Sequence, residues 1–168
     1  MSERDNHIKK LRLLMTEGDV GMYKIENAQK ELCEYLISMI PVEWKRICYY
    51  SKCTTGSRTS WIAVIEKKTR KICTQETFWK RYTSYPYDEM KAYVMLNKLT
   101  RNLYNAYLEK FGEDKIWCTY HLTIESDYTF HVDLGYEMPE GDIVEQHDAV
   151  FEKFFNTKYE YLEGKYPY

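Results

Sequence analysis

Two histidines and two carboxylates in one short stretch are the residues of this chain best suited to metal or acid–base chemistry. They are His121, His131, Asp133 and Glu137. The stretch alternates like a β-hairpin, which would put these side chains on one outward face with cross-strand neighbours about 5 Å apart. At that spacing two imidazoles and a carboxylate approach the geometry of a metal site. Because no fixed ligand-spacing motif accompanies them, solvated polar residues are the simpler interpretation, and we expect neither a metal nor a cofactor.

Other combinations of reactive residues give weaker signals. Glu125 with Asp127, and Asp133 with Glu137, could pair for acid–base catalysis, but acidic residues are frequent throughout this region. The sequence contains no GxSxG, no phosphate-binding glycine loop and no HExxH. We therefore predict that the chain is not an enzyme. The alternative is a metal-dependent enzyme that uses the face carrying the two histidines.

Charge is distributed unevenly along the chain. Residues 109–163 include fourteen acidic residues, four lysines and no arginine, a local net charge of −10, whereas the whole chain has a formal charge of −2. The same stretch is rich in Trp, Tyr and Phe. Acidic and aromatic residues together are typical of a surface that docks a basic partner. The candidate contact residues are Trp117, Glu125, Asp127, Asp133, Glu137, Glu140, Asp142, Glu145 and Asp148.

Composition also limits the compartment and the class of partner. The two basic clusters, residues 9–12 and 67–71, are short, so we expect no direct nucleic-acid binding from this slightly acidic chain. The charged N-terminus lacks the apolar core of a signal peptide, and no apolar run approaches the roughly twenty residues of a membrane span. Five scattered cysteines without a CxxC pair favour reduced thiols. We predict a cytoplasmic protein without a membrane partner.

Apolar periodicity predicts an α+β fold. Residues 1–22 form a basic N-terminal extension, at most a loose helix, and residues 23–168 form a single domain. The predicted elements are a helix at 22–40, strands at 46–53, 59–66 and 72–79, a helix at 88–111, a hairpin from 116–125 and 129–137, and a last helix from Pro139. Short connections require antiparallel pairing. The order α-βββ-α-ββ-α indicates an antiparallel sheet of about five strands with helices packed on one face.

The same alternation assigns side chains to faces. In the first hairpin strand, Tyr120, Leu122 and Ile124 should face the core. The opposite, outward face should carry Trp117, Thr119, His121, Thr123 and Glu125. The last helix should have an apolar side made of Ile143, Val144, His147, Val150, Phe151 and Phe154.

Three segments together resemble the YezG-like immunity proteins. Residues 40–44, Ile-Pro-Val-Glu-Trp, resemble the "IPxEW" motif that follows the first main helix of that family. Residues 117–137 are similar to its "W-T…ESDG-F…DY-YE" hairpin, with Tyr128 at the position of the motif's Gly. Residues 155–164 look like its closing "WKYKYLG" element.

The resemblance covers about residues 25–165 and implies a function. It implies a small cytoplasmic α+β protein that neutralises a cognate bacterial polymorphic toxin, often a nuclease, by binding it. A nuclease that is basic where it holds phosphate would fit the acidic, aromatic stretch of this chain. A third hypothesis is a scaffold that pairs with itself, for example as a homodimer.

Overall fold

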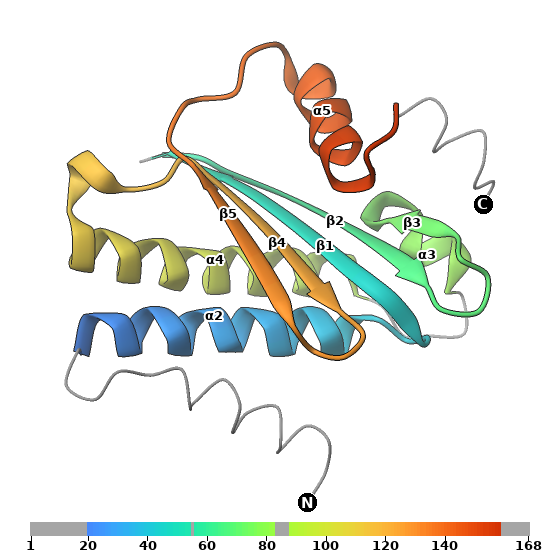
Figure 1. Cartoon of the computed structure of the whole chain (residues 1–168). Coiled ribbons are helices and arrows are strands. Elements are labelled where there is room, and N and C mark those ends of the chain that lie inside the picture. Colours follow the sequence, from blue (N-terminus) through green and yellow to red (C-terminus); the bar gives the residue numbers. More distant parts are fainter. Residues whose placement is uncertain (1–19, 55, 83–87, 159–168) are drawn as a thin grey trace, which may run out of the picture.

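The chain has the predicted α+β fold and the predicted order of elements. The computed structural model describes residues 20–54, 56–82 and 88–158, apart from the side chain of Trp79, so most of the predicted N-terminal extension lies outside the described residues. The elements in chain order are α2 (Val20–Met39), β1 (Trp44–Cys53), β2 (Arg58–Glu66), β3 (Ile72–Thr74), η1 (Gln75–Thr77), α3 (Phe78–Arg81), α4 (Glu89–Phe111), η2 (Glu113–Lys115), β4 (Thr119–Glu125), β5 (Phe130–Gly135) and α5 (Ile143–Phe155) (Figure 1).

Strand β1 is the centre of an antiparallel sheet with the order β3-β2-β1-β4-β5. Tyr49 in β1 lies opposite Ile62 of β2 on one side and opposite Leu122 of β4 on the other. The pairing of β1 with β4 joins the first half of the chain to the hairpin, which carries three of the nine predicted contact residues, Glu125, Asp127 and Asp133. No helix in the described ranges is long and apolar enough to cross a membrane.

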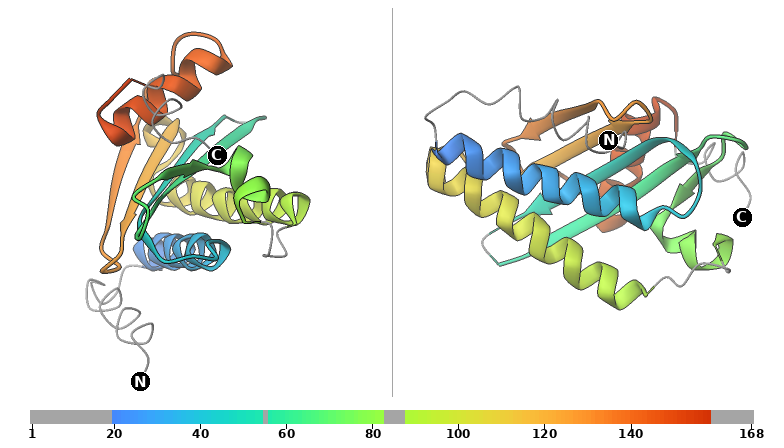
Figure 2. Two further views of the ribbon diagram at one scale, coloured as in Figure 1. Left: turned by 90° about the vertical axis from the view of Figure 1, so that its right-hand side faces the viewer. Right: turned by 90° about the horizontal axis from the view of Figure 1, so that it is seen from below.

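Helices α2 and α4 lie side by side across one face of the sheet (Figure 2). Leu32 and Leu36 of α2 and Leu103 of α4 have no solvent exposure, and they share one core with Tyr49. Each fully buried leucine contributes about 1.5–3 kcal/mol relative to an exposed one. The buried hydroxyl of Tyr49 is satisfied by hydrogen bonds with Thr100 and with Ser60, the latter at 3.1 Å.

Helix α5 lies on the opposite face, which corrects the prediction that all helices share one face. Phe151, 1% exposed, packs with Cys48 of β1, Ala63 of β2 and Ile72 of β3. The central strands are apolar on both faces, so the face away from α2 and α4 also needs a cover. Only the C-terminal half of α5 supplies it, because Ile143 and Val144 are 53% and 63% exposed rather than buried.

The third predicted strand is shorter than expected. Strand β3 ends at Thr74, and the chain then turns through η1 into the single-turn helix α3. Phe78 and Tyr82, one helical turn apart, are 1% and 7% exposed and belong to the α2/α4 core. The helical turn brings the two rings to 5.6 Å from each other, whereas four residues of extended chain would hold them about 13 Å apart.

Trp117 was predicted on the outward face, but it belongs to the core on the side of α2 and α4. Its side chain is 1% exposed, and its ring lies 5.2 Å from the ring of Tyr104 and 5.2 Å from the ring of Tyr120. Strand alternation begins only at Thr119, because a bend at Cys118 precedes β4. A residue before the bend does not follow the period of the strand, so Trp117 turns toward α4.

The turn between β4 and β5 forms where the sequence predicts it. Asp127 accepts hydrogen bonds from the backbone N–H of Thr129 at 2.9 Å and from its hydroxyl at 2.7 Å. Tyr128 has φ +65°, in the left-handed region that glycine adopts at no steric cost. Its ring packs edge-on against Trp44 at 6.0 Å, a contact that a glycine at this position would lack.

One buried charge cluster fixes α3 to the end of β2. Glu66 is 6% exposed, and its carboxylate accepts hydrogen bonds from Arg81, from Tyr82 at 3.0 Å and from Thr69 at 2.6 Å. The hydrogen bonds from Arg81 lower the pKa of Glu66 to about 2 and outweigh the opposing effect of burial. A depressed pKa means that the stabilisation is complete above the ordinary value and is lost as the pH falls.

We predict that Glu66→Gln lowers the free energy of unfolding by about 2–4 kcal/mol at pH 7, because the Arg81 guanidinium loses its buried counter-charge. The wild-type protein should lose stability as the pH falls from about 4.5 through about 2, and the variant should lose less. Urea denaturation at several pH values measures both effects. Glu43→Gln, at an exposed carboxylate near the same end of the sheet, is the control and should change neither.

We also predict that Gly135→Ala destabilises the hairpin by about 1–3 kcal/mol, because the added methyl group would collide with the hydroxyl of Thr119 on the paired strand. Adding Thr119→Ala to this variant should recover part of the loss. Gly56→Ala is the control, since no atom lies within 4 Å of the new methyl group there. Thermal unfolding of the wild type and the three variants tests the clash; equal loss in Gly56→Ala and Gly135→Ala would contradict it.

Candidate functional site

The connection from β5 into α5 exposes apolar and acidic side chains in alternation. The exposed apolar residues are Tyr136 at 59%, Met138 at 51%, Ile143 at 53% and Val144 at 63%. The exposed acidic residues between and beside them are Glu137, Glu140, Asp142 and Glu145. We call residues 136–145 the acidic segment. Large apolar groups are normally buried, so several of them exposed within ten residues indicate a binding surface.

Two of the acidic side chains start helix α5. Asp142 accepts hydrogen bonds from the backbone N–H groups of Val144 and Glu145, each at 2.9 Å. Glu145 in turn accepts a bond from the backbone N–H of Asp142 at 2.9 Å, which completes a capping box. Pro139 was predicted as the helix start, but the helix begins at Ile143 because the cap lies at Asp142.

Glycine is required just before this cap. Gly141 has φ +86°, and a methyl group on its Cα would collide with the side chain of Glu145. The positive φ turns the chain so that the capping box can close. The two carboxylates are therefore held in a defined arrangement at the positive end of the helix dipole.

Gln146 anchors the acidic segment to the sheet. Its side-chain amide donates to the carbonyl of Gly141 at 2.8 Å, and its carbonyl oxygen accepts a bond from the Lys52 ammonium of β1 at 2.6 Å. The acidic segment is thus tied to the central strand through a single side chain. This anchor was not predicted, because Lys52 and Gln146 are distant in sequence and neither belongs to a recognisable motif.

Two of the predicted contact residues lie at the other end of the hairpin. Glu125 forms an ion pair with Arg46 of β1 at 2.7 Å, and Asp127 is used in the turn. Strand β5 has six residues, so about 20 Å of sheet separates these carboxylates from the acidic segment. The turn between β4 and β5 and the connection into α5 lie at opposite ends of the hairpin (Figure 1), so Glu125 and Asp127 are separate from the acidic segment.

Asp133 and Asp148 have cationic or imidazole neighbours. Asp133 lies 3.2 Å from Nε2 of His131 and 3.9 Å from the Lys153 ammonium. Asp148 lies 3.3 Å from Nδ1 of His147. These neighbours reduce the local negative charge, whereas Glu137 and Glu140 make no hydrogen bond or ion pair with any residue that the structure describes.

The two histidines of the alternative metal hypothesis are in different environments. The ring of His121 lies beneath α5, 4.9 Å from Tyr50 and 5.6 Å from Phe154. Burial lowers the pKa of His121 to about 4, and Lys153 shifts it in the same direction. The side chains of His131 and Asp133 lie 3.2 Å apart, and His121 lies opposite Asp133 on the paired strand. Across the described ranges, no three His, Cys, Asp or Glu side chains are grouped to hold a metal ion.

His147 has a role that the sequence did not reveal. Its ring packs between Trp61 of β2 at 5.1 Å and Phe151 at 4.6 Å, and Nε2 lies 3.5 Å from a carboxylate oxygen of Glu76. Burial lowers the pKa of His147, but Glu76 and Asp148 more than compensate, so the pKa is raised above 6.5. Periodicity placed His147 on the apolar side of α5, and Glu76 is too distant in sequence to suggest the pair.

Comparison with known proteins gives a family match over most of the chain. The family model described as "Immunity protein YezG-like" matches residues 25–167, which is nearly the whole chain. No curated protein matches the sequence.

The pKa values of the two half-buried imidazoles should shift in opposite directions from the ordinary histidine value. We predict that NMR titration finds the pKa of His121 near 4 and that of His147 above 6.5. Glu76→Gln should lower the pKa of His147 and leave that of His121 unchanged. A raised folded-state pKa means that the contact with Glu76 stabilises α5 fully below pH 6.5 and progressively less as the pH rises through the folded-state value. Identical titration of His147 in both proteins would contradict this assignment.

Proposed function

The chain belongs to the YezG-like immunity protein family, and from this premise we propose that it binds and neutralises a cognate bacterial polymorphic toxin through the acidic segment. We propose that it does so in the cytoplasm as a stoichiometric inhibitor, without catalysis. The observation that carries the proposal is the exposure of four large apolar side chains among four carboxylates within residues 136–145.

The composition of the acidic segment suits a protein partner. Apolar side chains such as Tyr136 and Met138 are the kind of residue that becomes buried at the centre of an interface, while charged residues remain at its rim. The capping box and the Lys52–Gln146 bond hold the helical half in place before binding. Binding then costs less ordering of the chain than it would for a mobile loop.

We propose that the toxin is basic where it meets this surface, and that it is a nuclease whose phosphate-binding cleft the acidic segment occupies. A nuclease needs cationic side chains to hold the nucleic-acid backbone, so the carboxylates of the acidic segment would take the place of phosphates. Opposite charge would also speed association, because it steers the two proteins together before contact.

The predicted contact residues contribute unequally to this proposal. Glu137, Glu140, Asp142 and Glu145 surround the apolar centre of the contact, and Asp133 and Asp148 lie beside it. Glu125 and Asp127 would contact the toxin only if it reached the other end of the hairpin. Trp117 would act indirectly, because its ring is buried and packs against Tyr120 at the start of β4.

We predict that Glu137→Lys with Glu140→Lys raises the dissociation constant of the toxin complex about 10- to 100-fold at about 0.1 M salt, mainly through slower association. Both side chains are exposed and lack partners among the described residues, so the fold should be unaffected. Surface plasmon resonance with the toxin encoded beside the gene measures both rate constants. Glu31→Lys with Glu43→Lys makes the same change in net charge at exposed sites elsewhere and should leave binding intact.

Co-expression with the same toxin tests whether the chain neutralises it, whichever surface makes the contact. A one-to-one complex with inactive toxin supports immunity, and weaker association at high salt supports the acidic contact. A complex that forms equally well with the Glu137/Glu140 variant retains the immunity function but refutes the acidic segment as its contact. Absence of any complex would show that this toxin is not the target.

A further inference from the structure

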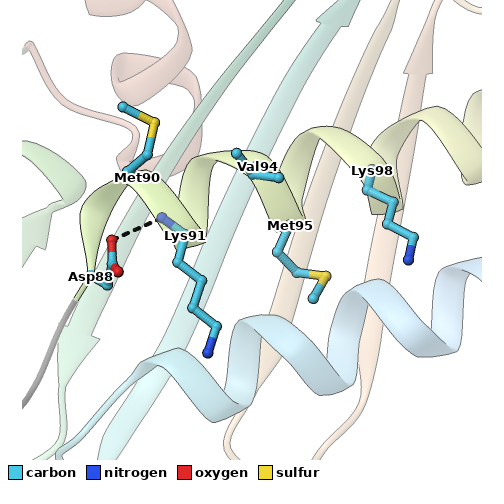
Figure 3. A pocket seen from close by; sticks show the side chains of 6 residues that line it. All are labelled: Asp88, Met90, Lys91, Val94, Met95 and Lys98. Atoms are coloured by element: carbon cyan, nitrogen blue, oxygen red, sulfur yellow. Dashed lines mark hydrogen bonds between the residues drawn. The ribbon is translucent and has the colours of Figure 1, made fainter.

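A shallow groove on the first half of α4 has the chemistry to bind an acidic chain segment. The groove has a volume of about 570 Å³ and is lined by Asp88, Met90, Lys91, Val94, Met95 and Lys98. Met90 and Val94 are 70% and 58% exposed, so its apolar wall is open to solvent. The side chains of Lys91, Met95 and Lys98 point to the same side of the helix (Figure 3).

The two lysines of the groove give it a positive charge that can bind an acidic group. Neither Lys91 nor Lys98 has an acidic partner among the residues that the structure describes. The one carboxylate of the groove, Asp88, is already used, since it accepts the backbone N–H of Lys91 at 2.9 Å and caps the helix. An occupant of this groove should therefore bring an apolar side chain between two carboxylates.

Direct pairing of two α4 helices does not meet this requirement. In an antiparallel pair related by a two-fold axis near Val94, residues on the same flank of the helix meet, so Lys91 of one copy would face Lys98 of the other. Like charges at such a contact are unfavourable. A symmetric helix pair would thus bring four ammonium groups together without a carboxylate between them.

The acidic segment has the required pattern. Glu137 and Glu140 are exposed and lie three residues apart, with the 51% exposed Met138 and the proline Pro139 between them. Pro139 restricts the preceding residue to extended backbone, and in a polyproline II conformation residues three apart lie on the same side about 9 Å apart. Lys91 and Lys98 are separated by seven helical residues, or about 10 Å.

From this match we propose that the groove of α4 binds residues Glu137–Glu140 of a second copy of the chain. Glu137 and Glu140 pair with Lys91 and Lys98, in one of the two directions along the helix, and Met138 packs against Met90 or Val94. The groove and the acidic segment lie on different elements and different faces of the sheet, so the contact forms between molecules (Figures 1 and 2). A head-to-tail complex of this kind has an unoccupied groove at one end and an unbound acidic segment at the other.

Self-association of this kind uses the residues that we propose for toxin binding. The two events then exclude each other, and a molecule bound to toxin cannot insert its acidic segment into a neighbour. The groove itself remains outside the toxin contact. Variants in the groove therefore separate the two proposals.

Sedimentation velocity of the wild-type chain at about 1–200 µM tests the association. The average mass should rise with concentration past that of a dimer, because the ends stay open, and should fall at 0.5 M salt. Lys91→Glu with Lys98→Glu should raise the dissociation constant at least about tenfold and leave toxin neutralisation intact. Lys45→Glu with Lys67→Glu, at exposed lysines away from α4, is the charge-matched control and should associate like the wild type.

Mixing two variants that do not self-associate identifies the occupant of the groove. Lys91→Glu/Lys98→Glu has an acidic groove, and Glu137→Lys/Glu140→Lys has a basic segment. Each should be monomeric alone, because its own groove and segment carry like charges. The equimolar mixture should associate, because each groove then meets a segment of opposite charge on the other variant. A wild-type protein that remains monomeric at 200 µM refutes the proposal. If Glu137→Lys/Glu140→Lys alone associates like the wild type while the groove variant does not, a different acidic segment occupies the groove, which also refutes the proposal.

Discussion

The structure depends on strand β1 being buried on both faces. Ile47 and Tyr49 face the helices α2 and α4, while Cys48 faces α5, and all three are without solvent exposure. A strand of this kind cannot lie at the edge of a sheet, so it must pair on both sides, with β2 and with β4. The pairing with β4 brings the second half of the chain onto the first. The position of the acidic segment, and everything proposed for it, follows from that pairing.

The start of α5 is held firmly in place although its apolar side chains are exposed. The helix covers only part of its face of the sheet, because Phe151 and Val150 are buried while Ile143 and Val144 remain outside. Its first turn is instead held by polar contacts, the capping box and the bond from Lys52 to Gln146. Polar contacts therefore hold Ile143 and Val144 in a fixed but exposed position, while apolar packing holds the other end of the helix.

Local patterns were enough to predict most of the elements, but not the turn from β3 into α3 or the faces that the helices cover. The stripes of α2 and α4, the cap at Asp88 and the turn at residues 126–128 depend on residues close in sequence, and each is present. The position of Trp117 depends on a bend at Cys118, and the face covered by α5 depends on which side of β1 remains open. The family itself was recognisable from three motifs, whereas the division of the acidic residues into two groups follows from strand geometry. Contacts such as His147 with Glu76 arise only from the fold.

Strand β5 forms one outer edge of the described sheet, and the character of this edge affects the tendency of the protein to aggregate. An exposed edge offers unpaired backbone groups to any other extended chain, and this is how aggregates begin. Here the edge has only six residues, and it carries the exposed side chains His131 and Asp133 at alternate positions. A second strand added at this edge would have to desolvate both polar groups. The edge of β5 therefore disfavours aggregation by addition of strands from other copies of the protein.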